Sequence, residues 1–398
     1  MVNRIVLNTI SYHGKGAIEK IPEELQARGY KKAFVCTDPD LLKFGVTQKV
    51  TGLLDAAKIP YEIYSEIKPN PTIENVQHGV ESFKRSGADC IVTIGGGSSM
   101  DTAKAIGIIV ENPEFADVRS LEGVAPTKKH AVFTIAVPTT AGTAAEVTIN
   151  YVITDVEKKR KFVCVDTNDI PEIAVVDPDM MASMPKGLTA ATGMDALTHA
   201  LEAYVSTEAT DFTDALAEKA ATLLFRFLPQ AYKDGADLTA REKVHNAACL
   251  AGMAFSNALL GIVHSMAHKT GAAFSTGHIP HGCANAIYLP YVIQYNAKDS
   301  VAAKRYAEIA RRMGLEGNSE KALINSLVAK IDEFNAKLNI PKTLKDFGIN
   351  EEEFKEKIAK ISELAVGDAC TGSNPRAIDP AAMEKLFTCT YYGTEVDF

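Results

Sequence analysis

The sequence lacks the features that would place a protein in a membrane, on a nucleic acid or in an oxidising compartment. Its seven cysteines are scattered and form no CxxC pair, which favours reduced thiols in a cytoplasmic protein over a disulfide framework. Acidic residues outnumber basic ones by 50 to 42, and no basic run indicates a nucleic-acid-binding face. The N-terminus has no signal-peptide organisation, and Ser256 and Asn257 interrupt the longest apolar stretch, 247–263. We therefore predict a buried core helix there, and no membrane or nucleic-acid partner.

The length of 398 residues predicts two domains, because single hydrophobic cores stop growing near about 250–300 residues. In the first half, short apolar runs alternate with amphipathic segments. The strand candidates are 32–37, 61–64, 90–94, 133–137 and 173–176, and the helix candidates between them include 48–58 and 73–86. This alternation predicts a Rossmann-like, doubly wound parallel sheet over residues 1–185, with ligands beyond the carboxyl ends of the strands.

Residues 186–398 show helical periodicity and no strand signal. The predicted helices are 189–206, 212–232, 239–259, 263–273, 290–295, 301–313, 320–338, 351–364 and 380–391. We therefore predict an all-helical second domain, so the fold class is α/β plus all-α. A second, smaller ladder of strands is predicted between residues 150 and 177, with the charged run Glu157–Lys161 as its turn.

The motif IGGGSSMDTAK at 94–104 places three glycines between a predicted strand and a predicted helix. Gly95, Gly96 and Gly97 would let a pyrophosphate approach the backbone closely, and the start of the helix supplies free N–H groups. The spacing departs from GxGxxG, the usual dinucleotide fingerprint. A plain turn explains the glycines equally well, and Asp101 is then only an acidic residue near the start of a helix.

Two further strand ends carry polar side chains. Asp38 follows the first strand, where an acidic residue accepts from a ribose 2′-hydroxyl and repels a 2′-phosphate. As part of Asp-Pro-Asp it also suits a turn. The loop after 133–137 carries the hydroxyls of Thr139, Thr140 and Thr143, which suit either a ligand or the cap of a helix. Three such strand ends in one parallel sheet favour a nucleotide site.

Four of the nine histidines lie in the segment Gly261–Gly282. His264 and His268 are spaced i, i+4, so they share one face of a predicted helix. Upstream, Asp195 and His199 form a second pair with the same spacing. One carboxylate with several imidazoles is a normal ligand set for Zn²⁺ or Fe²⁺. We therefore predict that the two segments bind one divalent metal.

Spacing alone leaves open which histidines of Gly261–Gly282 are ligands, the candidates being His264, His268, His278 and His281. The HIPHG run at 278–282 is predicted to be a loop because of its proline and glycine. The glutamate of an H-E-x-x-H motif is missing, which argues against a zinc protease. Four histidines elsewhere in the chain stand among polar or charged neighbours and are predicted at the surface: His13, His78, His130 and His245.

The motifs and their order resemble the iron-containing (type III) alcohol dehydrogenases over nearly the full length. The resemblance is carried by GGGSSMDTAKAIG at 95–107, PTTAGTAAEVTINYVITD at 138–155, ATGMDALTHALEAY at 191–204, GIVHSMAH at 261–268 and PHGCANAIYLP at 280–290. Within the family, the chain is similar to the lactaldehyde reductase (1,2-propanediol oxidoreductase) branch. The resemblance implies a dehydroquinate synthase-like fold, NAD, a divalent metal (Fe²⁺, with Zn²⁺ as the alternative) and a homo-oligomer of at least two copies.

The resemblance also implies residues for each site. The implied metal ligands are Asp195, His199, His264 and His281. His268 is implied as a proton relay or a substrate-side group, and Asp38 implies NAD rather than NADP. The implied cofactor residues are Asp38, Asn70, Gly96, Gly97, Ser98, Asp101, Thr139, Thr140, Thr143, Asn150 and Lys161. The stretch from His264 to His281 is longer than in lactaldehyde reductase through an extra STGH, so His278 competes for the last metal position.

The expected activity is hydride transfer between NAD(H) and a small primary alcohol, a diol or the corresponding aldehyde, such as 1,2-propanediol and lactaldehyde. One alternative is a non-redox lyase of the dehydroquinate synthase type, which also combines NAD and a metal. Such an enzyme needs several basic residues around a phosphorylated substrate, whereas Lys269 is the one basic residue in Gly261–Gly282. A metal-dependent hydrolase is the other alternative, and it predicts no NADH signal.

Overall fold

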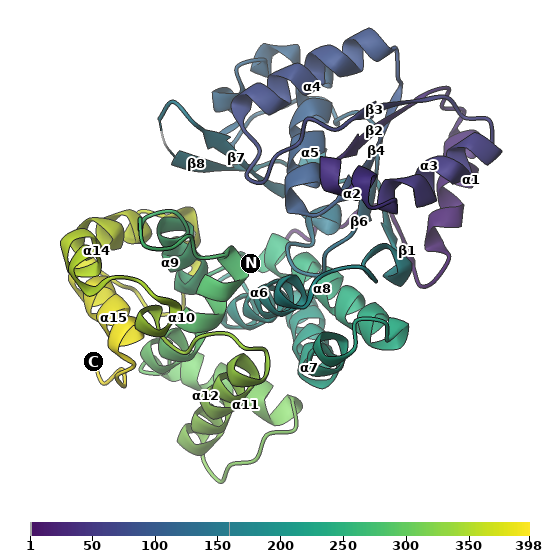
Figure 1. The fold of residues 1–398 in the computed structure, drawn as a ribbon. Helices are drawn as coiled ribbons and strands as arrows, with labels where there is room; N and C mark the ends of the chain where they lie inside the picture. Colours follow the sequence, from purple (N-terminus) through teal and green to yellow (C-terminus); the bar gives the residue numbers. More distant parts are fainter. Residues whose placement is uncertain (1, 159) are drawn as a thin grey trace. The chain divides into compact units, whose positions relative to one another are not determined.

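The structure is a computed structural model that describes residues 2–158 and 160–398. The chain divides into two compact units. One comprises Val6–Met184, and the other comprises Pro185–Phe398 together with the first residues up to Ile5. The first unit is an α/β structure and the second is helical (Figure 1). The predicted fold class is therefore confirmed.

The first unit is built on a six-stranded sheet in which every neighbouring pair is parallel. Its strands are β1 (Ile10–His13), β2 (Ala33–Thr37), β3 (Tyr61–Tyr64), β4 (Cys90–Gly95), β6 (Thr134–Pro138) and β9 (Ile173–Val176), in the order β1-β9-β6-β4-β2-β3. The five predicted strands are confirmed; β2, β4, β6 and β9 are buried throughout, as a strand covered on both faces is a continuous apolar run, whereas β3 is an edge strand. Strand β1 was not predicted; it lies at the edge, where it is only partly buried.

Helices cover both faces of this sheet. They are α1 (Lys20–Arg28), α2 (Pro39–Lys43), α3 (Val46–Ala56), α4 (Ile73–Ser86) and α5 (Gly97–Glu111). Neighbouring residues of β2 point to opposite faces, so Phe34 joins the core under α4 and α5 while Val35 joins the core under α1 and α3. The sheet thus has a separate apolar layer on each side. Short 3-10 turns complete the unit: Ala17–Glu19, Pro113–Phe115, Val118–Leu121, Ala145–Val147, Thr167–Asp169 and Pro178–Met180.

A small second sheet has the order β5-β8-β7, with β5 (Gly123–Val124), β7 (Asn150–Asp155) and β8 (Arg160–Val165). The predicted ladder is present, but its turn is shorter than predicted. Strand β8 begins at Arg160, so Lys161 lies in the strand opposite Thr154. Burial of Phe162 and Cys164 fixes this register, since alternate residues of a strand face the core. Lys159 of the predicted turn lies outside the described residues.

The second unit is helical. Its helices are α6 (Lys186–Val205), α7 (Asp211–Lys233), α8 (Leu238–Ala258), α9 (Ile262–Thr270), α10 (His281–Asn296), α11 (Ser300–Arg312), α12 (Glu320–Lys337), α13 (Leu344–Phe347), α14 (Glu351–Val366) and α15 (Pro380–Tyr392), with a 3-10 turn at Ala369–Ser373. The prediction missed α13 and placed the start of α10 nine residues late. Pro290 lies inside α10, and the expected loop at 278–282 ends at Pro280 because the helix begins at His281.

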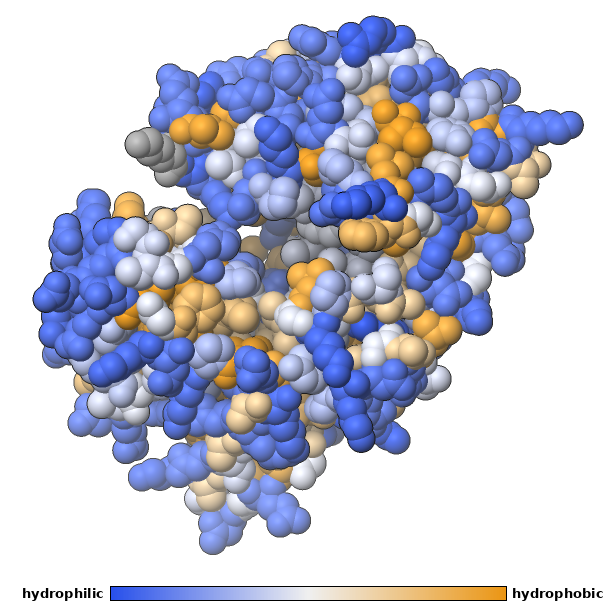
Figure 2. All heavy atoms as spheres, in the orientation of Figure 1, coloured by the Kyte–Doolittle hydropathy of each residue, from blue (hydrophilic) through white to orange (hydrophobic). Residues whose placement is uncertain are grey.

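Within the described ranges, no single helix is long and apolar enough to cross a membrane. Helices α8 and α9 reach this length and apolar character only when taken together, and the chain bends by 103° at the break between them. The face of the molecule seen in Figure 2 is mainly hydrophilic, with smaller apolar areas among the blue side chains. Exposed large apolar residues such as Phe44, Val124 and Phe212 come from separate elements.

Candidate metal centre and cofactor site

Helix α6 positions two of the predicted metal ligands. Asp195 and His199 lie one turn apart, and both are buried because α6 is enclosed along most of its length. Oδ1 of Asp195 is the common neighbour of three imidazoles. Its distance is 3.9 Å to Nε2 of His199, 3.6 Å to Nε2 of His264 and 3.5 Å to Nε2 of His281.

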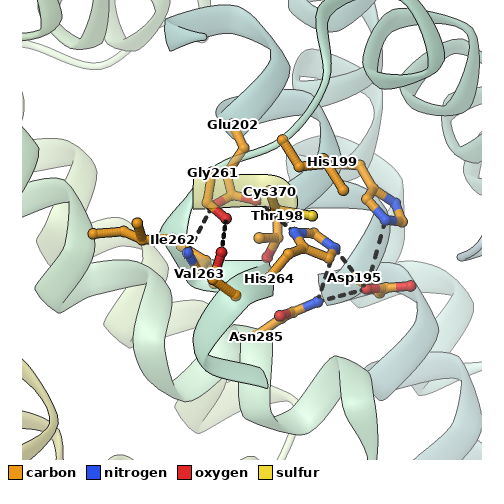
Figure 3. Close-up of polar contacts among 12 residues, drawn as sticks. Asp195, Thr198, His199, Glu202, Gly261, Ile262, Val263, His264, Asn285 and Cys370 are labelled. Atoms are coloured by element: carbon orange, nitrogen blue, oxygen red, sulfur yellow. Dashed lines mark hydrogen bonds and ion pairs between the residues drawn. The ribbon is translucent and has the colours of Figure 1, made fainter. Parts of the chain in front are cut away.

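The two other imidazoles come from α9 and α10, where His264 lies in the first turn of α9 and His281 is the first residue of α10. Donor atoms of Asp195, His264 and His281 all lie within 4.8 Å of one another. Ligands at about 2.1 Å from a tetrahedral metal are about 3.4 Å apart, so the separations from Asp195 fit one divalent ion. His199 is next to this group, with its ring stacked on His264 at a centroid distance of 4.6 Å (Figure 3).

The charges of the group suit a cation. Burial opposes ionisation of Asp195, but the imidazoles of His199, His281 and His264 hold the pKa of its carboxyl well below the ordinary value. Burial also opposes a charge on His264, yet the carboxylates of Glu202 and Asp195 raise the pKa of this imidazole to about 9. Desolvation lowers the pKa of His281. Asp195, His199 and His264 are buried, whereas the side chain of His281 is 40% exposed. A carboxylate with imidazoles is the donor chemistry of Fe²⁺ and Zn²⁺ sites.

Two residues that the sequence reasoning missed contact this group. Asn285 donates from Nδ2 to Oδ1 of Asp195 at 2.7 Å, and the same nitrogen lies 3.2 Å from Nε2 of His264. Glu202 lies 2.5 Å from Nδ1 of His264 through Oε2. A signal for both existed in the sequence, because Asn285 follows His281 by four residues and Glu202 follows Asp195 by seven, which places each pair on one helix face.

His268 belongs to a different group. Its Nδ1 lies 3.2 Å from Oδ2 of Asp368, and the same carboxylate oxygen is 2.7 Å from Nζ of Lys269. Burial works against the charge on Asp368, but the cationic partners hold the pKa of its carboxyl well below the ordinary value. The ring of His268 stacks on His281 at 5.4 Å, so it lies beside the metal donors. No sequence signal connects Asp368 with a histidine one hundred residues earlier.

The remaining histidines lie outside the group of converging metal donors. His278 is exposed in the loop between α9 and α10 and is not among the converging donors of the described residues. His13, His78 and His130 are exposed, as predicted. The prediction for His245 is wrong, because this residue is fully buried in α8. Glu242 and Lys243 lie on another face of the helix, whereas Arg241, one turn before His245, is buried on the same face, which local composition does not reveal.

In the first unit, the glycine motif joins β4 to the start of α5. Gly95 has a φ of 157°, and a Cβ on it would lie 2.3 Å from Oγ of Ser99. A Cβ on Gly96 would lie 3.2 Å from Oγ1 of Thr140, and one on Gly97 would lie 3.1 Å from Cγ2 of Thr143. The glycines therefore keep open a cradle of backbone N–H groups and threonine hydroxyls, which suits a phosphate group at the start of a 15-residue helix.

Other predicted cofactor residues lie around this cradle. Because β2, β4 and β6 are neighbours in the parallel sheet, Asp38, Gly96–Ser98 and Thr139 all follow the same edge. Asp38 is also the cap of α2, since its Oδ1 accepts from the Leu41 N–H at 2.9 Å. The turn interpretation of Asp38 therefore holds, while its Oδ2 makes no hydrogen bond among the described residues.

The last four predicted cofactor residues lie near the contact between α5 and the small sheet. Asn70, with a left-handed φ of 60°, donates from its N–H to Oγ of Ser98 at 3.3 Å and accepts from Nζ of Lys161 at 2.6 Å. Asp101 accepts from the Val152 N–H at 3.1 Å, and Asn150 begins the same strand. Burial raises the pKa of Asp101 to about 7, against the opposing effect of the nearby Lys104 ammonium.

Comparison with known proteins identifies one family for both units. The family profile described as iron-containing alcohol dehydrogenase matches residues 8–178, and the profile described as Fe-containing alcohol dehydrogenase family, C-terminal, matches residues 189–391. The chain is 50% identical over 378 residues to lactaldehyde reductase from Escherichia coli (strain K12), covering 94% of this chain and 96% of that one. It is 48% identical over 397 residues to NADPH-dependent butanol dehydrogenase from Clostridium saccharobutylicum, covering 99% and 100%.

Solved structures of alcohol and aldehyde oxidoreductases share the fold of this chain. A 1,3-propanediol oxidoreductase matches with a TM-score of 0.93 and 38% identity, covering 98% of this chain and 100% of that one. Sulfoacetaldehyde reductase from Bifidobacterium kashiwanohense, solved in complex with NAD⁺, matches with a TM-score of 0.86 and 27% identity, covering 98% and 99%. These matches favour alcohol–aldehyde redox chemistry over the lyase and hydrolase alternatives, and they support NAD and iron as the cofactors. The chain therefore belongs to the iron-containing alcohol dehydrogenase family and is an alcohol oxidoreductase.

Proposed function

We propose that the enzyme transfers hydride between NAD(H) and a small primary alcohol, a diol or the corresponding aldehyde, with 1,2-propanediol and lactaldehyde or short-chain alcohols as substrates. The convergence of donor atoms from Asp195, His264 and His281 within 4.8 Å is the observation that carries the proposal. The relatives named above act on small alcohols and aldehydes, which supports the substrate class. In this proposal residues 1–185 bind NAD and residues 186–398 hold the metal.

The proposed metal ligands are Asp195, His199, His264 and His281. When bound, divalent iron polarises the oxygen of the substrate, and NAD accepts or supplies the hydride. The side chains keep the donor atoms in place before the ion arrives: Asn285 holds Oδ1 of Asp195, and the stacked rings of His199 and His264 fix each other's planes. The same donor set suits Zn²⁺, so the choice of iron rests on the family.

We assign the proton transfer to His268. Asp368 occupies Nδ1 of His268, which leaves Nε2 as the nitrogen that exchanges a proton with the substrate oxygen. Lys269 binds the same oxygen of Asp368 at 2.7 Å, and Oδ1 accepts from the Cys370 N–H at 3.0 Å, so the carboxylate that orients the imidazole is itself held in place. The side chain of His268 is 24% exposed, which gives the proton a route to water.

The proposed NAD site uses the cradle at the start of α5 for the pyrophosphate and Asp38 for the adenosine ribose. The carboxylate of Asp38 accepts from a 2′-hydroxyl and repels a 2′-phosphate, which supports NAD over NADP. The butanol dehydrogenase relative is described as NADPH-dependent, so this preference needs a direct measurement on this chain.

We further propose a cytoplasmic enzyme that assembles from at least two copies. Seven free cysteines support a reducing compartment. Size-exclusion chromatography with light scattering tests the assembly, and a mass of about 43 kDa would contradict it.

The test of the metal assignment compares variants in metal content and in NADH-dependent aldehyde reduction. We expect His199→Ala and His281→Ala to lose both bound metal and activity. His268→Ala should keep the metal and lose activity, and His278→Ala should keep both. Metal retention with full activity in His199→Ala would show that the ligand assignment is wrong.

The substrate is tested by the rate of NADH oxidation with lactaldehyde, butyraldehyde, 3-hydroxypropionaldehyde and glyceraldehyde. All four are small uncharged aldehydes, and we expect NADH oxidation with at least one of them. Absence of NADH oxidation with all four, in protein that retains its metal, would contradict the proposed reaction.

A further inference from the structure

Glu202 is a buried carboxylate that the proposed mechanism does not use. It lies on α6 one turn beyond His199, and it is only 3% exposed. A buried carboxylate is costly unless each oxygen has a partner. Here both oxygens are partnered by α9: Oε1 accepts from the Val263 N–H at 2.7 Å, and Oε2 lies 2.5 Å from Nδ1 of His264 (Figure 3).

The contact with His264 decides which of its nitrogens binds a metal. An ionised carboxylate only accepts hydrogen bonds, so the proton of this short contact belongs on Nδ1. Nε2, which lies 3.6 Å from Oδ1 of Asp195, is then the nitrogen that gives up its proton when a divalent ion binds. The amide nitrogen of Asn285, which is a donor, lies 3.2 Å from the same Nε2. Glu202 on one side of the ring therefore leaves Nε2, on the other side, as the metal-binding nitrogen.

The second oxygen of Glu202 fixes the position of the ring. The first N–H groups of a helix have no partner within the helix. At the start of α9, Glu202 accepts from Val263 and Asn374 accepts from Ile262 at 3.3 Å. A Cβ on Gly261 would lie 2.9 Å from both acceptor oxygens, so only glycine lets the backbone approach them this closely. One carboxylate thus holds both the first turn of α9 and the imidazole that this turn carries.

We propose that Glu202 is a positioning residue of the metal centre: it holds the proton on Nδ1 of His264 and thereby directs Nε2 to the divalent ion. This inference rests on the assignment of His264 as a ligand. A carboxylate behind a metal-binding imidazole orients the ring and raises its affinity for the metal. Glu202 also adds a second negative charge to that of Asp195, so the two carboxylates balance the charge of one divalent ion.

The decisive variant is Glu202→Gln, which preserves the shape of the side chain. Glutamine has one acceptor oxygen, whereas the N–H of Val263 and Nδ1–H of His264 need two acceptors. One of them must therefore meet the amide NH₂, and the contact is relieved when the proton of His264 moves to Nε2. Glu202→Asp keeps two acceptors on a chain shorter by one methylene. Asn374→Ala is the matched control, because it removes the other cap of α9 and leaves the contact between Glu202 and His264.

The experiment measures Zn²⁺ affinity of the metal-stripped full chain by competition with a chromophoric chelator. We expect Glu202→Gln to bind Zn²⁺ about 10–100-fold more weakly than the unmodified enzyme. The Zn²⁺ affinity of Glu202→Asp should lie between these two values, and that of Asn374→Ala should stay near the affinity of the unmodified enzyme. The thermal unfolding midpoint of each metal-free variant shows that it is folded. Unchanged Zn²⁺ affinity in folded Glu202→Gln would overturn the proposal.

A spectroscopic readout separates the tautomer from simple helix capping. In ¹⁵N-histidine-labelled, Zn²⁺-loaded protein, Nδ1–H of His264 should give a strongly downfield proton signal that Glu202→Asp and Asn374→Ala retain. In Glu202→Gln the signal should move upfield or disappear. Equal loss of Zn²⁺ affinity in Glu202→Gln and Asn374→Ala, with the signal unchanged, would mean that Glu202 only caps α9 and would overturn the proposal.

His264→Ala in the same assay separates this inference from the proposed function. If His264→Ala loses Zn²⁺ affinity while Glu202→Gln does not, the role of Glu202 is wrong and the ligand assignment stands. If His264→Ala binds Zn²⁺ as the unmodified enzyme does, the ligand assignment itself is wrong.

Discussion

Asp38 combines two roles at the end of β2. Its Oδ1 caps α2 through the Leu41 N–H, and this contact fixes the side chain beside the edge of the sheet where we propose that the nucleotide binds. A carboxylate fixed in this way keeps its charge where a 2′-phosphate would lie. The cap and the cofactor preference therefore depend on different properties of one residue, its shape and its charge.

Asp38→Asn removes the charge and keeps the cap, since asparagine is an equally good N-terminal cap. We expect kcat/KM for NADPH to rise by roughly tenfold, a change of about 1.4 kcal/mol, while that for NADH falls. Steady-state kinetics with both cofactors measure the ratio. Asp40→Asn, which removes an exposed charge from the same helix, is the control and should leave the ratio unchanged. No change in the ratio for Asp38→Asn would show that Asp38 does not face the ribose.

Helix α10 carries His281 and is held against α6 by a close backbone contact. A Cβ on Gly282 would lie 1.9 Å from the carbonyl oxygen of Ala191, so the two helices meet at a point where no side chain fits. This contact places His281, the first residue of α10, beside Asp195, which lies one turn after Ala191 on α6. The packing of two helices thus sets the distance between two metal donors.

Gly282→Ala should be destabilising although alanine favours helices by about 1 kcal/mol over glycine. The clash is with backbone, which does not rotate away, so we expect a net loss of about 2 kcal/mol or more and a fall in Tm of several degrees. Metal content should fall as well. The control is Gly187→Ala in α6, where a Cβ meets nothing within 4 Å and should raise Tm slightly. A Tm increase in both variants would contradict the contact.

Helix α5 is tied to the small sheet by two residues spaced i, i+3. Lys104 is buried and donates from Nζ to the carbonyl oxygens of Thr148 at 2.6 Å and Asn150 at 3.0 Å, and Asp101 accepts from Val152. These bonds hold the start of β7 against the helix whose N-terminus forms the phosphate cradle.

Asp101 makes the stability of this contact depend on pH. Its folded pKa of about 7 is raised above the ordinary value of 3.8, so its contribution is fully present below pH 3.8 and is lost as the pH rises through 7. Asp101→Asn keeps an acceptor for Val152 and removes the titration. We expect its free energy of unfolding to exceed that of the unmodified enzyme by a small amount at pH 5 and by more at pH 8, on the order of 2–4 kcal/mol, with a higher Tm at pH 8 as the readout. A Tm difference between the two proteins that does not change with pH would contradict the raised pKa of Asp101.

At the scale of the whole molecule, we propose that two compact units of different architecture carry the two chemical tasks. The parallel sheet of Val6–Met184 offers a row of strand ends for a nucleotide, and the helices of Pro185–Phe398 supply buried faces for a metal. Each unit has its own secondary structure type because each task needs a different geometry: open strand ends in one case, and packed helix faces in the other.

Removal of the metal should therefore loosen one unit selectively. A ligand at 100 times its Kd stabilises the state that binds it by about 2.7 kcal/mol. In hydrogen–deuterium exchange we expect a chelator to increase exchange in peptides from α6, α9 and α10, and NADH to protect peptides from β2, β4 and the start of α5. Equal changes in α3 and α12, which carry no predicted site residue, would contradict the assignment of the two sites.

Much of this architecture follows from the sequence alone. The apolar runs of the buried strands and the capping residues of the helices are local signals, and Thr210, Asp237, Ser319, Asn350 and Asp379 each cap the helix that follows them. The spacing of Asp195 and His199 is local too, because helix periodicity puts them on one face. The glycine motif was recognisable because it follows a strand and opens a helix. These features depend on neighbours within a few residues.

Only the tertiary structure decided which donors meet. Glu202 is 62 residues from His264 and Asp368 is 100 residues from His268, and no periodicity connects such pairs. His268 and His264 share a helix and a spacing, yet one faces Asp368 and the other faces Asp195. The start of α10 at His281 depends on how Gly282 packs against α6, and His245 is buried by helices distant in sequence. Sequence determines which faces carry ligands; packing determines which of those faces meet, because contact between distant segments is a property of the whole core.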